Sequence, residues 1–416
     1  MNYTEALEYI HSVNWTFCKP GLERITALCE ALGDPQKDLK FIHVAGTNGK
    51  GSFCSMTESV LRAAGYKTGL YTSPYIKVFN ERMQVCGEMI SNEELASLTE
   101  YVKPIADAMT DKPTEFELIT AIAFEYFKRH KCDVVVLEAG MGGRLDSTNI
   151  IREPLLSVIT GIALDHTAFL GDTVEKIAAE KAGIIKDKSP ILWGGDDMSA
   201  RAVIENTARE KGSEFFFVDY EKLQNINATL DGTTLDFCEH KDIKIALLGL
   251  YQPKNTAVVL SAVDILRKEG MDIPESAVKK GLLAARWQAR FEILSREPLV
   301  IFDGAHNPQG IDSAVMSIKH YFKNKKVYVM TGVLKDKDYD VISTRLSEIA
   351  SRAFVMTPEN PRALDGEEYA KILEAKGVES KAYATIKEAF ETAKQAAKQD
   401  GVPLVCLGSL YTYSSI

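Results

Sequence analysis

Short apolar runs rich in β-branched residues alternate with longer helical patterns along this chain, and this alternation limits the fold more than any other feature. The runs extend from Phe41–Ala45 to Phe215–Val218, and they resume from Leu299–Phe302 to Leu404–Leu407. Such alternation is typical of parallel strands with helices on both faces of a sheet. We therefore predict an α/β protein with two mostly parallel sheets.

The alternation breaks once. Ile226–Phe237 followed by Ile243–Leu248 indicates a small β-hairpin element, with Asp231-Gly232 as its turn signal. The length of 416 residues suggests two or three domains. We expect a larger domain over residues 1–289, whose sheet carries a phosphate-binding P-loop, and a smaller Rossmann-like α/β domain over residues 290–416.

Composition narrows the classes of partner. The chain has 49 Lys and Arg residues against 58 Asp and Glu residues, for a net charge of −9. That balance argues against a protein that coats nucleic acid or an anionic membrane, and no apolar run reaches the roughly 18 residues of a membrane span. Seven cysteines without a C-x-x-C pair favour reduced thiols in a cytoplasmic protein, and the N-terminus shows no signal-peptide pattern.

A glycine-rich turn joins the first apolar run to a helical pattern, in the sequence F-I-H-V-A-G-T-N-G-K-G-S at residues 41–52. Glycines let backbone N–H groups approach phosphate oxygens, and the lysine adds a positive charge at the helix N-terminus. Val44 replaces the first glycine of the general G-x-x-x-x-G-K-[ST] pattern, and the hydroxyl comes one residue late. The alternative is a tight turn with a surface lysine. We predict that four residues bind nucleotide phosphates: Gly49, Lys50, Gly51 and Ser52.

Several motifs, in order along nearly the whole chain, carry a family resemblance. The loop H-V-A-G-T-N-G-K-G-S at residues 43–52 resembles the nucleotide loop of folylpolyglutamate synthases and dihydrofolate synthases, which belong to the Mur ligase superfamily. The other similar segments are G-L-E-R at 21–24, T-S-P at 72–74, F-N-E-R at 79–82, E-A-G-M-G-G-R-L-D-S-T-N at 138–149, L-D-H at 164–166, E-K-A-G at 180–183, D-G-A-H-N-P at 303–308 and D-K-D at 336–338. Tyr75 and Tyr251 stand where the family has histidine.

The resemblance implies an ATP-dependent ligase. Such an enzyme adds L-glutamate to the γ-carboxyl of a folate, or to the carboxyl of dihydropteroate, through an acyl phosphate, and it uses ATP and Mg²⁺. It also implies a monomer. Two alternatives stay open: another Mur-type amino-acid ligase, acting on a peptidoglycan precursor, and a P-loop NTPase without ligase output. The motif D-G-A-H-N-P in a second domain argues against the NTPase.

Metal ligands and catalytic groups follow from the same resemblance. Glu138 comes directly after Val134–Leu137, at the strand end where open α/β sheets bind ligands, and magnesium prefers oxygen ligands. The resemblance implies that Ser73 and Glu138 hold a first magnesium and that His166 holds a second. It also implies that Lys181 is carbamylated, although a lysine in an Ala-rich helical pattern is ordinarily solvated. The implied catalytic residues are Lys50, His166, Lys181 and His306.

The remaining implied contacts reach ATP, glutamate and the pterin. Asn255 would meet the adenine, although it could simply cap a helix. Arg290 would reach the phosphates of ATP, unless it forms a linker salt bridge. Asp303 would meet the nucleotide, and His306 would lie near the incoming glutamate or the transferred phosphate. The implied pterin-contacting residues are Gly21, Leu22, Glu23, Arg24, Thr114, Glu115, Phe116, Glu117, Leu145, Asp146 and Ser147. Of these, Asp146 would bind the pterin ring and Phe116 would stack on it, or belong to the core.

Overall fold

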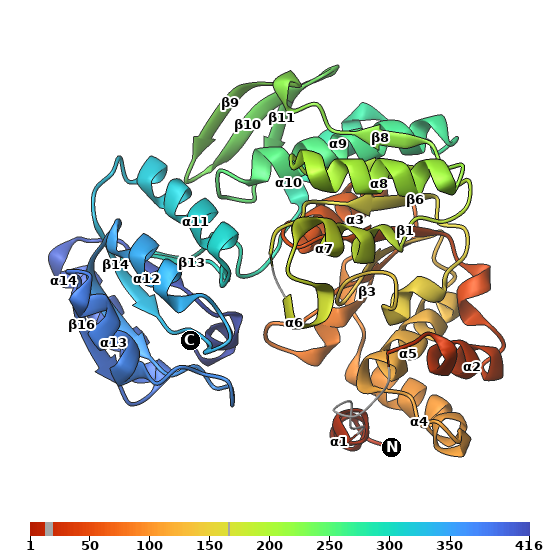
Figure 1. The fold of residues 1–416 in the computed structure, drawn as a ribbon, viewed down its shortest axis with the longest axis horizontal. Helices are drawn as coiled ribbons and strands as arrows, with labels where there is room; N and C mark the ends of the chain where they lie inside the picture. The colour runs from red at the N-terminus through yellow and green to blue at the C-terminus, as the bar shows by residue number, and fades with distance from the viewer. Residues whose placement is uncertain (13–19, 165–166) are drawn as a thin grey trace. The chain divides into compact units, whose positions relative to one another are not determined.

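The computed structural model describes residues 1–12, 20–164 and 167–416. The chain divides into two compact units, and Figure 1 labels many of their helices and strands. Unit 1 comprises residues 1–224, 236–243 and 254–285, and unit 2 comprises residues 225–235, 244–253 and 286–416. Among the helices of the described residues, none has the length and apolar character needed to cross a membrane.

Unit 1 is built on an eight-stranded sheet. Its order is β4 (Glu88–Met89), β3 (Met83–Val85), β2 (Thr68–Tyr71), β5 (Val134–Glu138), β1 (Phe41–Ala45), β6 (Leu156–Ile159), β7 (Ile191–Trp193) and β8 (Phe215–Phe217). Neighbouring strands from β2 to β8 pair in parallel, whereas β3 pairs antiparallel with β2 and with β4. Every residue of β1 and β5 is buried, as expected for central strands covered on both faces.

Helices cover this sheet and set its cores. One core joins Phe41, Tyr71 and Leu137 of the sheet to four helices: α1 (Tyr3–Ser12), α2 (Glu23–Ala31), α4 (Asn92–Ala108) and α5 (Glu115–Arg129). A second joins Ile159 and Trp193 to α7 (Val174–Ala182) and α8 (Met198–Glu210). The unit also contains α3 (Lys50–Ala63), α6 (Thr167–Leu170), most of α9 (Gln252–Lys268) and α10 (Glu275–Ala284).

A small sheet follows, in the order β11 (His240–Ile245), β10 (Gly232–Phe237) and β9 (Leu223–Thr229). The turn at Asp231 joins β9 to β10, as the hairpin prediction required. The strand predicted from Ile243 begins earlier, at His240, and pairs with the hairpin as its third strand.

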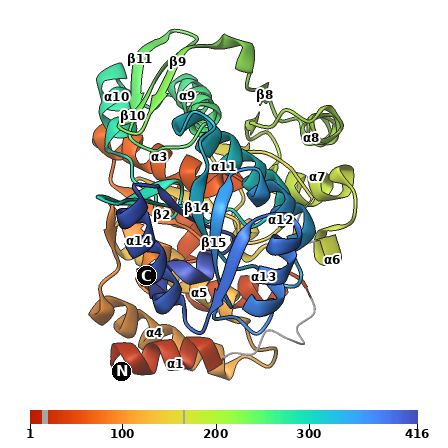
Figure 2. The same cartoon turned by 90° about the vertical axis from the view of Figure 1, so that its left-hand side faces the viewer.

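Unit 2 contains a six-stranded sheet. Its order is β12 (Glu292–Arg296), β13 (Leu299–Phe302), β17 (Leu404–Leu407), β14 (Val327–Thr331), β15 (Ala350–Met356) and β16 (Glu379–Tyr383). The pairing is parallel except at β12, which runs antiparallel to β13. One core joins the sheet to α11 (Pro308–Tyr321), α12 (Tyr339–Ser347) and α13 (Gly366–Ala375), while α14 (Ile386–Asp400) lies on the other side of β14 and β15 (Figure 2). The predicted α/β class with a larger and a smaller parallel-sheet region is therefore confirmed.

Candidate active site

The glycine-rich turn after β1 is shaped by two glycines in backbone conformations that other residues rarely adopt. Gly46 has φ 153° and Gly49 has φ 88°, and Gly49 is the N-cap of α3. A Cβ at Gly46 would lie 2.0 Å from Thr160 Oγ1, and one at Gly49 would lie 2.8 Å from Asn255 Oδ1. The backbone of the turn is therefore free of side chains where it approaches β6 and α9, as a phosphate-binding loop requires.

Two hydroxyl groups that the sequence interpretation did not single out hold this loop in place. Thr160 follows β6, and its Oγ1 donates to the carbonyl oxygen of Asn48 at 2.8 Å. Thr47 Oγ1 donates to the carbonyl oxygen of Ala163 at 3.2 Å and accepts from its N–H at 3.1 Å. The sequence position of Thr160 could have indicated this role, because a hydroxyl at the carboxyl end of a strand beside β1 is placed to reach the loop.

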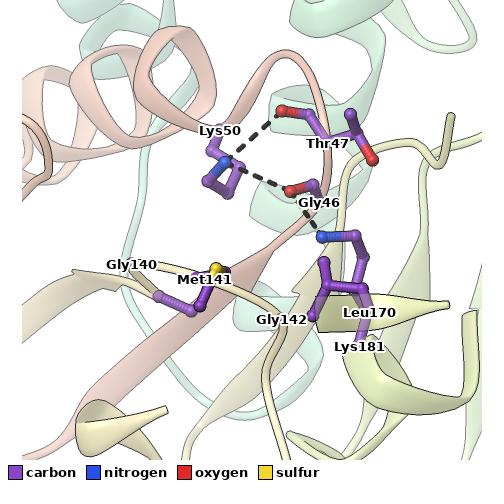
Figure 3. A pocket seen from close by; sticks show the side chains of 9 residues that line it. Gly46, Thr47, Lys50, Gly140, Met141, Gly142, Leu170 and Lys181 are labelled. Carbon is purple, nitrogen blue, oxygen red and sulfur yellow. Dashed lines mark hydrogen bonds between the residues drawn. The ribbon is translucent and has the colours of Figure 1, made fainter. Parts of the chain in front are cut away.

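Two lysines converge on one carbonyl oxygen of the loop (Figure 3). Lys50 Nζ donates to the carbonyl oxygen of Gly46 at 3.1 Å, and Lys181 Nζ donates to the same oxygen at 3.0 Å. Lys50 lies in the first turn of α3, whereas Lys181 lies on α7 and is only 4% exposed. A buried lysine at this point contradicts the simple interpretation of Lys181 as a solvated surface residue.

A cavity of about 40 Å³ opens beside these lysines. Its other wall is the turn after β5, which carries Met141, and Leu170 closes one side (Figure 3). The complete lining is Gly46, Thr47, Lys50, Ala139, Gly140, Met141, Gly142, Leu170 and Lys181. Two primary amines and a glycine-rich backbone on the walls make this cavity suitable for an anion such as a phosphate group.

A buried carboxylate completes the edge of this site. Glu138 ends β5 and is 3% exposed; its Oε1 lies 3.8 Å from Lys50 Nζ, and its Oε2 accepts from the N–H of Ser73 at 3.4 Å. The fold thus brings Ser73 and Lys50 close to Glu138, whereas Ser52 is buried within α3. His166 lies outside the described residues. Within the residues that are described, no three His, Cys, Asp or Glu side chains already form a metal-binding group.

Several predicted pterin-contacting residues bind one another instead of presenting free polar groups. Arg24, which is 8% exposed, donates through Nε to Glu117 Oε2 at 3.0 Å. The same Glu117 oxygen accepts from the N–H of Thr114 at 2.6 Å, which closes a capping box at the start of α5. Glu115 lies 3.2 Å from His11 Nδ1. These contacts anchor α2 and α1 to α5.

Other residues of that set lie against the cavity. The ring of Phe116 fills the space where a Cβ of Gly140 would stand, 2.6 Å from its nearest atom. Asp146 accepts from the N–H of Met141 at 2.8 Å, so it holds the turn that lines the cavity. Burial raises the pKa of Asp146.

The remaining predicted pterin-contacting residues differ in exposure and position. Ser147 is buried beside Asp146, whereas Leu145 is exposed. Gly21, Leu22 and Glu23 lie at or before the start of α2.

Unit 2 has its own cluster of predicted site residues around Asp303, at the end of β13. Asp303 is 3% exposed and accepts from the Tyr251 hydroxyl at 2.7 Å, from the Phe291 N–H at 3.0 Å and from the Ala305 N–H at 2.8 Å. Burial raises the pKa of Asp303, and the Arg290 guanidinium opposes this effect. His306 Nδ1 lies 2.8 Å from the carbonyl oxygen of Gly304. Asn255, in contrast, belongs to unit 1 and lies beside Gly49.

Comparison with family models finds two matches. Residues 44–263 match the Mur ligase middle domain, and residues 289–410 match the Mur ligase glutamate ligase domain. Together these segments span most of both units.

Individual proteins are similar over the whole chain. The dihydrofolate synthase/folylpolyglutamate synthase of Bacillus subtilis is 38% identical over 426 residues, covering 100% of this chain and 98% of that relative. The folylpolyglutamate synthase of Lacticaseibacillus casei is 36% identical over 431 residues, with the same coverage. A solved structure described as an FPGS–AMPPCP–folate complex superimposes with a TM-score of 0.87 at 34% identity, covering 100% of this chain and 98% of that one.

Proposed function

Because this chain belongs to the folylpolyglutamate synthase and dihydrofolate synthase family of Mur ligases, we propose that the cavity beside Lys50 is where ATP activates its carboxylate substrate. The chain is an ATP-dependent ligase that adds glutamate to folate. The observation that supports the proposed location is the position of Lys50, whose Nζ donates to the carbonyl oxygen of Gly46 at 3.1 Å and lies 3.8 Å from Glu138 Oε1.

The chemistry needs two steps. The γ-carboxylate of the folate attacks the γ-phosphorus of ATP, which breaks the bond to the β-phosphate oxygen and releases ADP. The amine of L-glutamate then attacks the acyl phosphate; the new amide bond replaces the bond to phosphate, which leaves, and the amine loses a proton. Catalysis of such steps rests on alignment and on charge stabilisation rather than on a nucleophilic side chain.

In this proposal Lys50 and the N–H groups of Gly49, Gly51 and Ser52 bind the β- and γ-phosphates. Asn255, next to Gly49, contacts the adenine. Arg290 and Asp303 would contact the nucleotide, and His306 would contact the glutamate or the transferred phosphate. We accordingly assign ATP and pterin binding to residues 1–289 and glutamate ligation to residues 290–416.

The residues at the edge of the cavity fit a magnesium ion. Glu138 is a buried carboxylate beside the phosphate loop, and its Oε2 accepts from the backbone N–H of Ser73, a residue whose side chain carries a hydroxyl. Ser73 and Glu138 would hold a first Mg²⁺ and His166 a second. Oxygen ligands of this kind suit Mg²⁺, which when bound would neutralise phosphate charge.

The buried position of Lys181 supports its carbamylation. Two ammonium groups donating to the same carbonyl oxygen repel each other, and Lys181 is nearly fully buried. Carbamylation would remove that repulsion, because a neutral Lys181 amine adds to CO₂, loses a proton and becomes an anionic oxygen donor. With ¹³C-labelled bicarbonate, we expect an NMR carbamate signal that Lys181→Arg lacks; the same signal in the variant would contradict the assignment.

The folate would extend from the cavity towards Asp146 and Phe116, with the other predicted pterin-contacting residues shaping the surrounding surface. We propose a monomer in the cytoplasm. The latter is supported by the absence of disulfides among the six described cysteines: Cys29, Cys54, Cys86, Cys132, Cys238 and Cys406.

Incorporation of radiolabelled glutamate tests the function and its two acceptors side by side. With ATP and magnesium, we expect label to be incorporated into tetrahydrofolate. Incorporation into dihydropteroate as well would add dihydrofolate synthase activity, which the name of the Bacillus subtilis relative includes. ATP hydrolysis without incorporation into either acceptor would contradict the ligase function.

A further inference from the structure

A fully buried histidine lies in the central strand that leads to the phosphate loop. His43 on β1 is 0% exposed, and its Nε2 lies 2.8 Å from Thr148 Oγ1 on the 3₁₀ helix Ser147–Ile150. Thr148 is 0% exposed as well. His43 Nδ1 is buried and has no hydrogen-bond partner.

The direction of these hydrogen bonds follows from a third residue, Asp146, which is hydrogen-bonded to Thr148. Thr148 Oγ1 lies 2.6 Å from Asp146 Oδ1, and an ionised carboxylate can only accept. The Thr148 hydroxyl therefore donates to Asp146, so it must accept from His43, whose proton lies on Nε2. A buried neutral ring fits this tautomer: burial, with a contribution from the Lys186 ammonium, lowers the pKa of His43 to about 3.

The Asp146 carboxylate, which ends this series of hydrogen bonds, is bonded to the wall of the cavity. Besides the Thr148 hydroxyl, Asp146 accepts from the Thr148 N–H at 3.1 Å and from the Met141 N–H at 2.8 Å. Met141 lines the cavity shown in Figure 3. The hydrogen bonds thus run without interruption from the core of β1 to the turn opposite Lys50.

We propose that His43 and Thr148 are positioning residues for pterin recognition, and that they act by orienting the Asp146 carboxylate. This inference rests on the proposed function, in which Asp146 binds the pterin ring. A carboxylate recognises a ring N–H selectively only if its oxygens are held in one orientation. Hydrogen bonds from His43, on the central strand β1, to Thr148 and from Thr148 to Asp146 provide that constraint. The unpartnered Nδ1 is consistent with a ring placed for its Nε2 proton.

Matched variants can separate positioning from packing. Thr148→Val keeps the shape of the side chain and removes the hydroxyl, whereas Thr148→Ser keeps the hydroxyl. His43→Gln places an amide N–H close to the position of Nε2, whereas the shorter His43→Asn does not. Ser157→Ala is the control: Ser157 pairs with His43 across β1 and β6, is buried, and donates to the carbonyl oxygen of Ile184.

The measurements are the KM for dihydropteroate or tetrahydrofolate, the KM for ATP, and the Kd for dihydropteroate from fluorescence titration. We expect Thr148→Val and His43→Asn to raise the pterin KM and Kd about tenfold, with the ATP KM within twofold, as for the loss of one oriented hydrogen bond. Thr148→Ser and His43→Gln should stay within about threefold of the wild type by the same argument. Ser157→Ala should leave both constants unchanged.

A double variant decides whether the effect passes through Asp146. In an Asp146→Ala background, Thr148→Val should no longer change the Kd for dihydropteroate. Unchanged pterin constants in Thr148→Val, equal changes in the pterin and ATP KM, or a further loss in the Asp146→Ala background would overturn the inference while leaving the ligase function intact. A wild type that incorporates no glutamate into either acceptor would overturn the proposed function itself.

Discussion

Each unit buries an aspartate beside its parallel sheet, and the two are held by different kinds of partner. Asp146 in unit 1 is held by its own neighbourhood, through Thr148 and Met141. Asp303 in unit 2 accepts from Tyr251, which is 52 residues away, and from Phe291. Burial raises the pKa of both carboxyl groups. The groups that donate directly to Asp146 thus lie within five residues of it, whereas Asp303 accepts both from Ala305 beside it and from distant segments.

This difference implies different roles. Asp146 is linked by hydrogen bonds to Thr148, and through it to His43, and also to Met141 in the cavity wall. Substitutions at these residues should therefore alter substrate binding. Asp303 ties the segment that precedes α9 to the segment that enters β12 and to β13, so changes there should first alter the stability of unit 2. The predictions below test this division, together with its premise that the chemistry depends on Lys50.

The largest effect is expected at the cavity itself. Lys50→Ala should lower the rate of glutamate incorporation about 1000-fold or more, because it removes a cation placed for the developing phosphate charge. The midpoint of thermal unfolding should change little. Lys176→Ala, on the exposed face of α7, is the control and should keep full activity. Normal ligation by a folded Lys50→Ala variant would place the phosphate site elsewhere.

Asp303→Ala should produce the largest loss of stability in unit 2. It leaves the Tyr251 hydroxyl and two backbone N–H groups without their acceptor, which should lower the free energy of unfolding by about 3 kcal/mol or more. Asp365→Ala removes an exposed N-cap of α13 and should cost only about 1 kcal/mol. Urea unfolding of the two variants measures the difference. Equal losses would mean that Asp303 is an ordinary capping residue.

The same contrast explains how much the sequence could predict. The strands Phe41–Ala45, Leu299–Phe302 and Leu404–Leu407 have the predicted bounds, because buried parallel strands are continuous apolar runs. The helical pattern expected after the glycine-rich turn is α3, which begins at Lys50 with Gly49 as a left-handed N-cap. The antiparallel edge strands β3, β4 and β12 were missed, because they are short and alternate less clearly.

Site residues followed the same rule. The resemblance pointed to Lys50, Glu138 and Ser73, which the fold brings together, and local motifs made that possible. It pointed to Arg24 and Glu117 as pterin contacts, and the ion pair between them is a tertiary contact that the motifs do not indicate. Partners that depend on tertiary contacts, such as Thr160 with Asn48 or Tyr251 with Asp303, could not be found from spacing along the chain.

Tyr251→Phe tests the long-range partner of Asp303 alone. It removes one hydroxyl donor from a buried carboxylate that keeps its two backbone donors, so we expect a loss of about 2 kcal/mol, less than for Asp303→Ala. The matched control is Tyr328→Phe, whose hydroxyl donates to Asp400 at an exposed site and should contribute about 0.5 kcal/mol. If both variants lose the same amount, the Tyr251 contact is no more important than a surface hydrogen bond.

The smallest effect is a pH dependence that belongs to unit 1. The pKa of His43 is about 3 in the folded chain against 6.5 as its ordinary value, so below pH 6.5 the unfolded chain binds a proton that the folded ring does not. Its contribution to stability is therefore complete above pH 6.5 and is lost as the pH falls towards 3. From pH 8 to pH 6.0, the wild type should lose about 0.8 kcal/mol relative to His43→Gln, which has no titrating ring. Denaturant unfolding of both proteins at several pH values measures this difference, and a difference that stays constant over that range would show that His43 does not stay neutral in the core.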